Sequence, residues 1–423
     1  MESLYIFVVI LGLICVIGFF NEKVTKLTYE IALMLFSTII GVIILIVVSL
    51  SENTDVANVL KEIQGFDIHD FLMHGVLCFM LFAGSCHMKL RDFKEQARQI
   101  TVLAFVCTLL GAVFYALLIY GAGYLFGYTL SLPVCLMFGS IIAPTDPIAA
   151  TGILSKFGLP KKTSFLLQGE SLFNDGVGVA LFVCFSGMVS ATSGSGEQSS
   201  IIGLMLKEIF GALAIAVAVT LLCFLMFRFI KHTYLKIFIS LLTVSMSYAL
   251  CEAFGFSGAI ASVICGILFS ELRTRFDQAE DEEQTKHFDT FWETLDVFLN
   301  SVLYVIMGLS FVVVLKMEYV LLLAGIAILA NLIARTASLS LSSLIIGKIP
   351  DGFSRGGFIT LLTWGGLRGG LSVALAMSTK DILPEEAYYI ILGCTYAIVF
   401  FTTVVQGLTM KPVYRKISKG IKT

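Results

Sequence analysis

Three carboxylates fall within apolar stretches of one region of the chain, between Phe138 and Leu181. Asp146 stands between two prolines, and Glu170 and Asp175 follow on one predicted helix. A charge in apolar membrane surroundings costs about 2.5–3.5 kcal/mol on insertion scales, so such groups mark functional sites. A carboxylate in a low dielectric also holds its proton more tightly than one in water. We therefore expect a proton and a cation to compete for this region.

A monovalent cation needs several oxygen ligands, and the same region supplies them. Asp175 and Ser171 offer side-chain oxygens, and Thr145 offers a hydroxyl group. The prolines around 144–147 remove helix donors and free backbone carbonyls there. A carboxylate such as Asp175 that binds either a proton or a cation, but never both, gives exchange by competition alone.

A polar stripe is predicted on the apolar helix that carries two of the carboxylates. Side chains three and four residues apart share a helix face. The residues of the stripe are Glu170, Ser171, Asn174 and Asp175. At 1.5 Å per residue, these groups lie about 11 to 18 Å from the predicted cytoplasmic end of the helix.

Two arginines, Arg335 and Arg368, also lie inside apolar segments. Arg368 is flanked by four glycines over 365–370, which predicts a second broken helix opposite the one around 144–147. The two segments are predicted to run in opposite directions, and such a pair is typical of inverted-repeat transporters. Ordinary kinks would not explain the charge at each break. We expect the arginines to neutralise spare carboxylates and the helix ends that meet where the breaks cross.

The composition indicates an all-α integral membrane protein. The chain has 423 residues, of which 57% are hydrophobic and 14% are charged. In soluble domains, about a quarter of all residues are charged. A basic, aromatic-rich patch for nucleic acid is not evident. The ten cysteines are scattered without metal-site spacing, and we expect no cofactor.

About thirteen apolar segments are long enough to span a bilayer. Their predicted limits are 4–20, 30–50, 69–88, 100–126, 130–154, 163–188, 202–230, 234–252, 255–272, 292–316, 319–346, 355–379 and 386–410. The acidic stretch 277–289 is interpreted as a solvated cytoplasmic face, with a funnel that concentrates cations as the alternative.

The loop charges predict the orientation in a plasma (inner) membrane. With thirteen spans, nearly all loop lysines and arginines fall on one side, and the other side holds only Lys61, Lys316 and Lys380. Basic loops stay in the cytoplasm. The N-terminus is therefore expected outside and the C-terminus in the cytoplasm.

Four stretches together resemble the NhaP and Na⁺/H⁺-exchanger branch of the monovalent cation–proton antiporters. They read APTDP, GESLFND, NLIARTASLSL and GGLRGG, and the resemblance covers most of the chain. It implies an antiporter for Na⁺, with Li⁺ or K⁺ as alternatives, that works by alternating access as a homodimer in the lipid bilayer. It is not expected to be an enzyme.

The resemblance also implies a division of the single transmembrane domain 1–423. The expected parts are a core bundle at 100–188 and 319–410, a dimerisation bundle at 1–99 and 234–316, and a linking helix at 202–230.

The resemblance implies a role for each candidate site residue. Asp175 would bind the cation and carry the proton, Ser171 and Thr145 would be ligands, and Asp146 would lie close by. Asn174 before the aspartate goes with electroneutral one-for-one exchange. Glu170 would form a structural ion pair with Arg335. Arg368 would compensate charge in the second broken helix.

One residue departs from the family pattern, and two other functions compete with antiport. Many members have a glutamate where this chain has Ala83. A channel, or a carrier of another small ion or an organic anion, is an alternative because Arg368 could bind a carboxylate. An intramembrane aspartyl protease fits poorly, because the glycines follow Asp175 rather than precede it.

Overall fold

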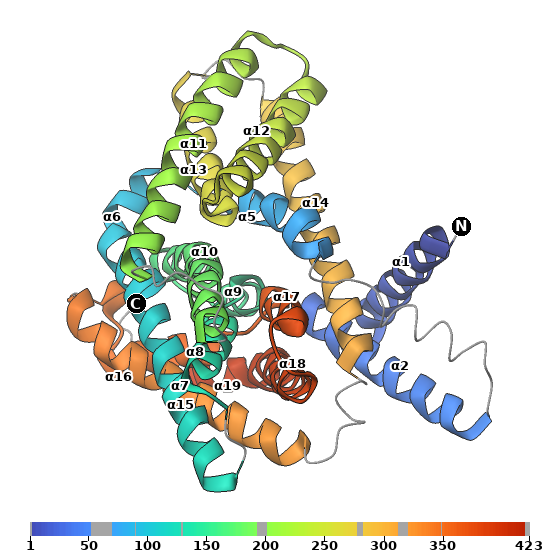
Figure 1. Ribbon diagram of the computed structural model, residues 1–423. Coiled ribbons are helices and arrows are strands. Elements are labelled where there is room, and N and C mark those ends of the chain that lie inside the picture. The colour runs from blue at the N-terminus through green and yellow to red at the C-terminus, as the bar shows by residue number, and fades with distance from the viewer. Residues whose placement is uncertain are drawn as a thin grey trace.

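The structure, a computed structural model, describes residues 2–51, 70–88, 90–127, 130–192, 201–276, 282–311, 320–347 and 349–418. Every regular element within these ranges is a helix (Figure 1). Some of the basic residues used for the orientation lie outside the described ranges, namely Lys61, Lys89, Lys316, Lys348, Lys419 and Lys422, as do residues 277–281 of the acidic stretch.

Nine helical segments of the described residues are long and apolar enough to cross a membrane. They are Tyr5–Thr25, Tyr29–Val47, Leu90–Leu125, Lys161–Ser190, Leu206–Phe229, Thr233–Phe254, Glu283–Ser310, Leu322–Ile346 and Glu385–Ser418. The chain is therefore a multi-pass membrane protein, and the predicted all-α membrane class is confirmed.

The other four predicted segments coincide with shorter, broken or more polar helices. They are α5 (Leu77–Ser85) with the π-helical turn Phe71–Val76 before it, α13 (Gly258–Phe276), the pair α8 (Leu132–Ile142) and α9 (Pro147–Ser155), and the pair α16 (Arg355–Gly365) and α17 (Gly370–Met377). The total of thirteen spans stays a prediction.

One predicted boundary is wrong. The tenth apolar segment was expected to begin at residue 292, but its helix α14 spans Glu282–Ser310. The charged residues before 292 therefore continue the helix instead of preceding it. From residue 282 onward the acidic stretch is therefore helical, and its interpretation as a solvated cytoplasmic face stays a prediction.

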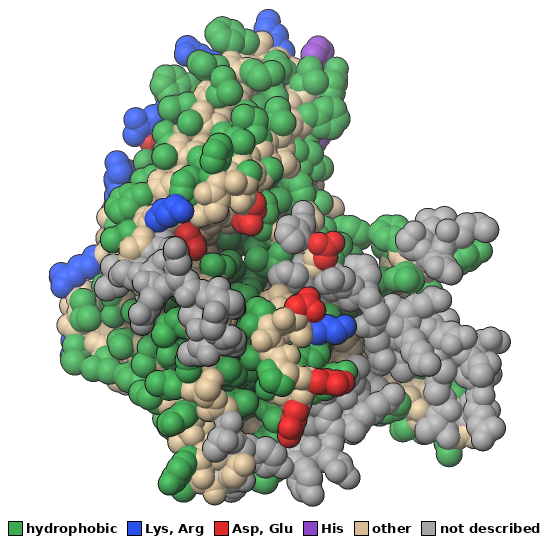
Figure 2. All heavy atoms as spheres, viewed as in Figure 1, with side chains coloured by type: hydrophobic (Ala, Val, Ile, Leu, Met, Phe, Trp, Pro, Cys, Tyr) green, Lys and Arg blue, Asp and Glu red, His purple; other side chains and the backbone are tan. Residues whose placement is uncertain are grey.

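Among the described residues, apolar side chains dominate the face of the molecule shown in Figure 2. Large side chains such as Leu125 and Phe229 are about four-fifths exposed. Soluble monomers rarely expose contiguous apolar surface of this extent, whereas lipid tails accept it. The exposed apolar surface therefore fits a chain that lies in a bilayer.

One group of helices packs around α14. α14 lies along α2 (Tyr29–Ser51), and both contact α1 (Glu2–Phe20). α5 contacts α14 and α13, which in turn packs with α11 (Ile201–Phe229) and α12 (Thr233–Phe254). Figure 1 shows α11, α12 and α13 together at one end of the molecule, and α1 and α2 at the far end of α14.

A second group packs around the broken helices. α7 (Thr108–Phe126) lies between α8 and α15 (Val320–Ile346), and α18 (Glu385–Phe400) contacts α15 and α17. α10 (Lys161–Thr192) packs on α8 and also reaches α13 of the first group. The helix that carries Glu170 and Asp175 therefore lies between the two groups (Figure 1).

Candidate functional site

The two breaks in the chain meet, as the inverted-repeat pattern predicts. α8 ends at Ile142 and α9 begins at Pro147, while α16 ends at Gly365 and α17 begins at Gly370. The Asp146 amide donates a 2.7 Å hydrogen bond to the Leu367 carbonyl, which joins the two unwound stretches as an isolated antiparallel bridge. Backbone groups freed by the breaks are thus partly satisfied by each other.

Arg368 closes the carbonyl end of α8. One guanidinium nitrogen, Nη1, donates to the Ala143 and Pro144 carbonyls at 2.6 and 2.8 Å, and Nη2 donates to Asn331 Oδ1 at 2.9 Å. The side chain is buried, with 3% of the residue exposed. A fixed positive charge at the end of a helix that has unpaired carbonyls is electrostatically favourable.

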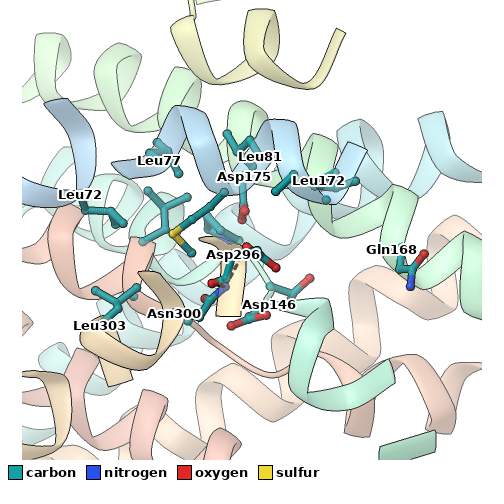
Figure 3. Close-up of a pocket in the computed structure, with 18 of the residues that line it drawn as sticks. Leu72, Leu77, Leu81, Asp146, Gln168, Leu172, Asp175, Asp296, Asn300 and Leu303 are labelled. Atoms are coloured by element: carbon teal, nitrogen blue, oxygen red, sulfur yellow. Dashed lines mark hydrogen bonds between the residues drawn. The ribbon is translucent and has the colours of Figure 1, made fainter. Parts of the chain in front are cut away.

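A cavity of about 300 Å³ lies beside this crossing. Its wall is formed by residues of α10, α5 and α14 and by both breaks. Asp175, Thr145 and Asp146 line it, and Figure 3 shows the carboxyl groups of Asp175 and Asp146 directed toward its middle. The Asp146 carboxylate also accepts a 2.6 Å hydrogen bond from the Tyr304 hydroxyl. Carboxylate and hydroxyl oxygens from two elements therefore converge on one space.

Ser171 and Asn174 hold Thr145 from behind. The Asn174 amide nitrogen donates to Thr145 Oγ1 at 2.7 Å, and its amide oxygen accepts from the Thr145 backbone N–H at 3.3 Å. The Ser171 hydroxyl donates to the Thr145 carbonyl and lies 3.1 Å from Thr145 Oγ1. Ser171 and Asn174 are buried and are not part of the described cavity wall. They fix the shape of the break against α10.

Small residues allow this close packing. A side chain at Gly178 would overlap the Pro144 ring. Only a residue without a Cβ atom lets the proline-containing break lie directly on α10. Asp175, three residues before Gly178, is thereby held close to Thr145 and Asp146.

Glu170 lies on another side of α10. Its carboxylate accepts a 2.5 Å hydrogen bond from Arg335 Nη2 of α15, and both side chains are at most 5% exposed. Arg335 Nη1 also contacts Cys107 Sγ at 3.8 Å. The expected single polar stripe on α10 is therefore wrong in part, because Glu170 faces α15 and Asp175 faces the cavity.

The structure brings two unpredicted polar residues to the same cavity. Asp296 and Asn300 of α14 line it, and Figure 3 shows Asp296 beside Asp175 and Asp146. The signal in the sequence is an aspartate and an asparagine at i and i+4, which share a helix face. They were not predicted as site residues because the predicted span began at residue 292, which placed Asp296 near the end of the span. Ala83 lines the cavity from α5 and gives that wall no carboxylate.

The chain is similar to known transport proteins over almost its whole length. Residues 6–416 match the family described as sodium/hydrogen exchanger, transmembrane. The Na⁺/H⁺ antiporter NhaP of Pseudomonas aeruginosa is 32% identical over 361 residues, which cover 85% of this chain and 84% of that one. The Na⁺/H⁺ antiporter NhaG of Bacillus atrophaeus is 28% identical over 402 residues, which cover 95% and 72% of the two chains.

A solved structure has the same fold. The sodium proton antiporter MjNhaP1 of Methanocaldococcus jannaschii superimposes with a TM-score of 0.72, and the match covers 99% of each chain. The sequence identity is 18%, so this similarity shows the fold alone. The expected inverted-repeat antiporter fold is confirmed by it.

Proposed function

The chain belongs to the sodium/hydrogen exchanger family, and we propose that it is a secondary active antiporter that exchanges Na⁺ for H⁺. Li⁺ or K⁺ are the alternative cations, because the oxygen ligands suit all three. The observation that carries the proposal is the convergence of Asp175, Thr145 and Asp146 on one cavity at the crossing of two broken helices. Relatives named Na⁺/H⁺ antiporter support it.

The exchange follows from competition at Asp175. The carboxylate binds a proton or a cation, and the arrival of one releases the other. Each half-cycle then carries one positive charge, so the exchange is electroneutral with one cation for one proton. Alternating access would move the loaded site from one side of the membrane to the other.

The remaining ligands come from the break and from α10. Thr145, Asp146 and Ser171 would contribute oxygens, with Ser171 turning its hydroxyl from the Thr145 carbonyl toward the ion. Asn174 would act mainly as a positioning residue, because both polar atoms of its side chain bond Thr145. The ion would thus be held between α10 and the unwound stretch after α8.

The buried charges outside the cavity would be structural. Glu170 and Arg335 neutralise each other, and Arg368 neutralises the carbonyl end of α8. Arg368 has its guanidinium nitrogens Nη1 and Nη2 bonded to the protein and is not part of the described cavity wall. This arrangement disfavours the alternative of an organic-anion carrier that uses Arg368.

We propose a division of the chain into bundles that the packing of the helices supports. We place the core at 100–188 and 319–410, the dimerisation bundle at 1–99 and 234–316, and the linking helix at 202–230. The packing of α7, α8, α15 and α18 around the breaks supports this division, as does the packing of α1 and α2 against α14. We propose a homodimer in the plasma membrane, with the N-terminus outside and the C-terminus in the cytoplasm.

Proton release in proteoliposomes tests the function. Vesicles with an acidic interior and a trapped pH indicator would receive Na⁺, K⁺, Li⁺ or choline in turn. Alkalinisation by Na⁺ but not by choline is expected, and it should continue when a potassium ionophore clamps the membrane potential. Proton flux that follows an added organic anion instead of a cation would contradict antiport.

A further inference from the structure

Three polar residues on the cavity wall have no part in the proposed exchange at Asp175. Asp296 and Asn300 lie on α14, and Ser372 lies in the first turn of α17. Asn300 is 4% exposed and Ser372 is 1% exposed. Buried polar side chains normally find a hydrogen-bond partner, so polar atoms left open toward a cavity point to a ligand.

Asn300 is oriented by its neighbour. Its amide nitrogen donates to the Asp296 carbonyl and to Asp296 Oδ1, both at 3.0 Å. Within the described part of the chain, both hydrogen bonds of this side chain use the nitrogen. The amide oxygen is therefore available on the cavity side, next to a carboxylate that Figure 3 shows among the cavity residues.

The hydroxyl of Ser372 is a second unpaired group on the same wall. Within the described residues, Ser372 Oγ is buried without a hydrogen-bond partner. α17 approaches α14 closely here, because a Cβ atom at Gly370 would overlap Leu303. The oxygens of Asp296, Asn300 and Ser372 thus follow the contact between α14 and α17.

The facing wall cannot provide such oxygens. The residues that α5 contributes are mainly apolar and include Leu77, Leu81 and Ala83. A cation that enters the cavity therefore meets its polar groups on the side of α14 and the breaks. The cavity wall also carries the carboxylates of Glu293, on α14, and of Asp146 and Asp175, and Figure 3 shows Asp296 beside the last two.

We propose that Asp296 and Asn300 form a second, outlying subsite for a monovalent cation, which delivers the ion to the exchange site at Asp175. This inference rests on the proposed antiport. The Asp296 carboxylate and the Asn300 amide oxygen supply the first protein ligands, and water completes the shell. Ser372 offers a further oxygen on the same wall.

The subsite has a consequence for the transport kinetics. It lies on α14, which packs mainly with α2 and α5 and reaches the core through its contact with α17. An ion that binds there and moves on to Asp175 is carried across the membrane once, at Asp175, so the subsite leaves the one-for-one stoichiometry unchanged. The subsite raises the local cation concentration at Asp175 and therefore lowers the cation KM.

Neutralising the subsite tests the proposal. In Asp296→Asn we expect the cation KM to rise about tenfold, which equals about 1.4 kcal/mol of binding. The maximal rate and the cation-to-proton ratio should stay as in the wild type, and Asp296→Glu should restore most of the affinity. Asn300→Ala should give a smaller rise. Glu283→Gln, an exposed carboxylate on the same helix outside the cavity, is the matched control and should change nothing.

High salt separates a bound ion from a general negative potential. In 1 M choline chloride the screening length is about 3 Å, so a diffuse potential is lost while direct ligands still act. The difference between wild type and Asp296→Asn should persist there. An Asp296→Asn protein with the KM of wild type or of Glu283→Gln, or a difference that disappears in salt, would overturn the subsite.

Thallium scattering gives a measurement on the unaltered protein. Tl⁺ replaces monovalent cations and scatters strongly, so crystals of the wild type in Tl⁺ should show a peak at Asp296 and Asn300 that is distinct from the one at Asp175. A peak at Asp175 alone would refute the subsite and leave antiport standing. A wild type without cation-driven proton release would refute antiport itself.

Discussion

Two carboxylates of one helix have opposite surroundings. Glu170 and Asp175 are five residues apart on α10, which separates them by about 140° around the helix axis. Glu170 is paired with Arg335 in closed packing, whereas Asp175 faces a cavity that holds two more aspartates. The residue types are nearly the same, and the partners differ.

This difference shows how a membrane protein separates a fixed charge from an exchangeable one. A buried carboxylate with an arginine partner keeps its charge, and removing either partner leaves the other uncompensated. A carboxylate without a fixed cation must take up a proton or a mobile cation. The position of the arginine therefore decides which of the two groups can exchange ions.

The largest expected effect is at Asp175. Asp175→Asn cannot take up either ion as a charged group, so cation-driven proton release should fall at least about a thousandfold, or by about 4 kcal/mol. The protein should still elute as a folded particle in detergent, because an amide has the same shape. The exposed Asp381→Asn should retain full activity. Exchange that survives Asp175→Asn would remove the basis of the comparison.

Substitutions of the ion pair between Glu170 and Arg335 should lower the stability of the protein. Glu170→Ala and Arg335→Ala should each lower the free energy of unfolding in detergent by about 3–5 kcal/mol, because each leaves a buried charge alone. The double substitution should cost less than the sum of the two. Arg91 and Glu95 form a 3.7 Å pair with exposed side chains and serve as the control, with little effect expected. Additive losses at 170 and 335 would show that the two groups do not act as a pair.

Asn174 lies between the two sides and offers a smaller test. Asn174→Asp cannot donate to the Thr145 hydroxyl, and it places another carboxylate beside the break. We expect the exchange rate to fall about tenfold, which equals about 1.4 kcal/mol and is typical of one lost buried hydrogen bond. Thr145→Val removes the same bond and should give a comparable loss. Unequal losses, with Thr145→Val near the wild type, would mean that the bond does not position the break.

The smallest expected effect is at Tyr304. Tyr304→Phe removes the hydrogen bond to Asp146 and leaves the ring in place. A loss of about 0.5–1 kcal/mol corresponds to a fall in exchange rate of about two- to fivefold. The exposed Tyr389→Phe is the control. A rate above that of the wild type would show that the bond restrains Asp146 from binding the ion.

The sequence was sufficient for features that depend on local chemistry. Prolines around Asp146 and glycines around Arg368 break helices wherever they occur, so both unwound stretches could be predicted. Arg335 could be recognised as a structural charge because an arginine inside an apolar segment needs a partner. The predicted span limits were close wherever apolar runs ended at polar loops.

Features that depend on packing could not be predicted. Asp296 appears in the sequence at the start of an apolar run, and only the helix that begins at Glu282 shows that it lies well inside. Tyr304 reads as one more aromatic residue of a span until Asp146 is placed beside it. The separation of Glu170 from Asp175 also required the neighbours of α10 to be known.

The bond between the Asp146 amide and the Leu367 carbonyl is made by main-chain atoms only. Such a bond does not depend on the side chains, so substitutions at the crossing can leave the hydrogen bond between the two broken helices in place. This gives a physical reason why the fold can stay the same at a sequence identity as low as the 18% to the solved structure. The backbone can hold the two broken helices together at the crossing, while the side chains around it, which would set the ion preference, can change.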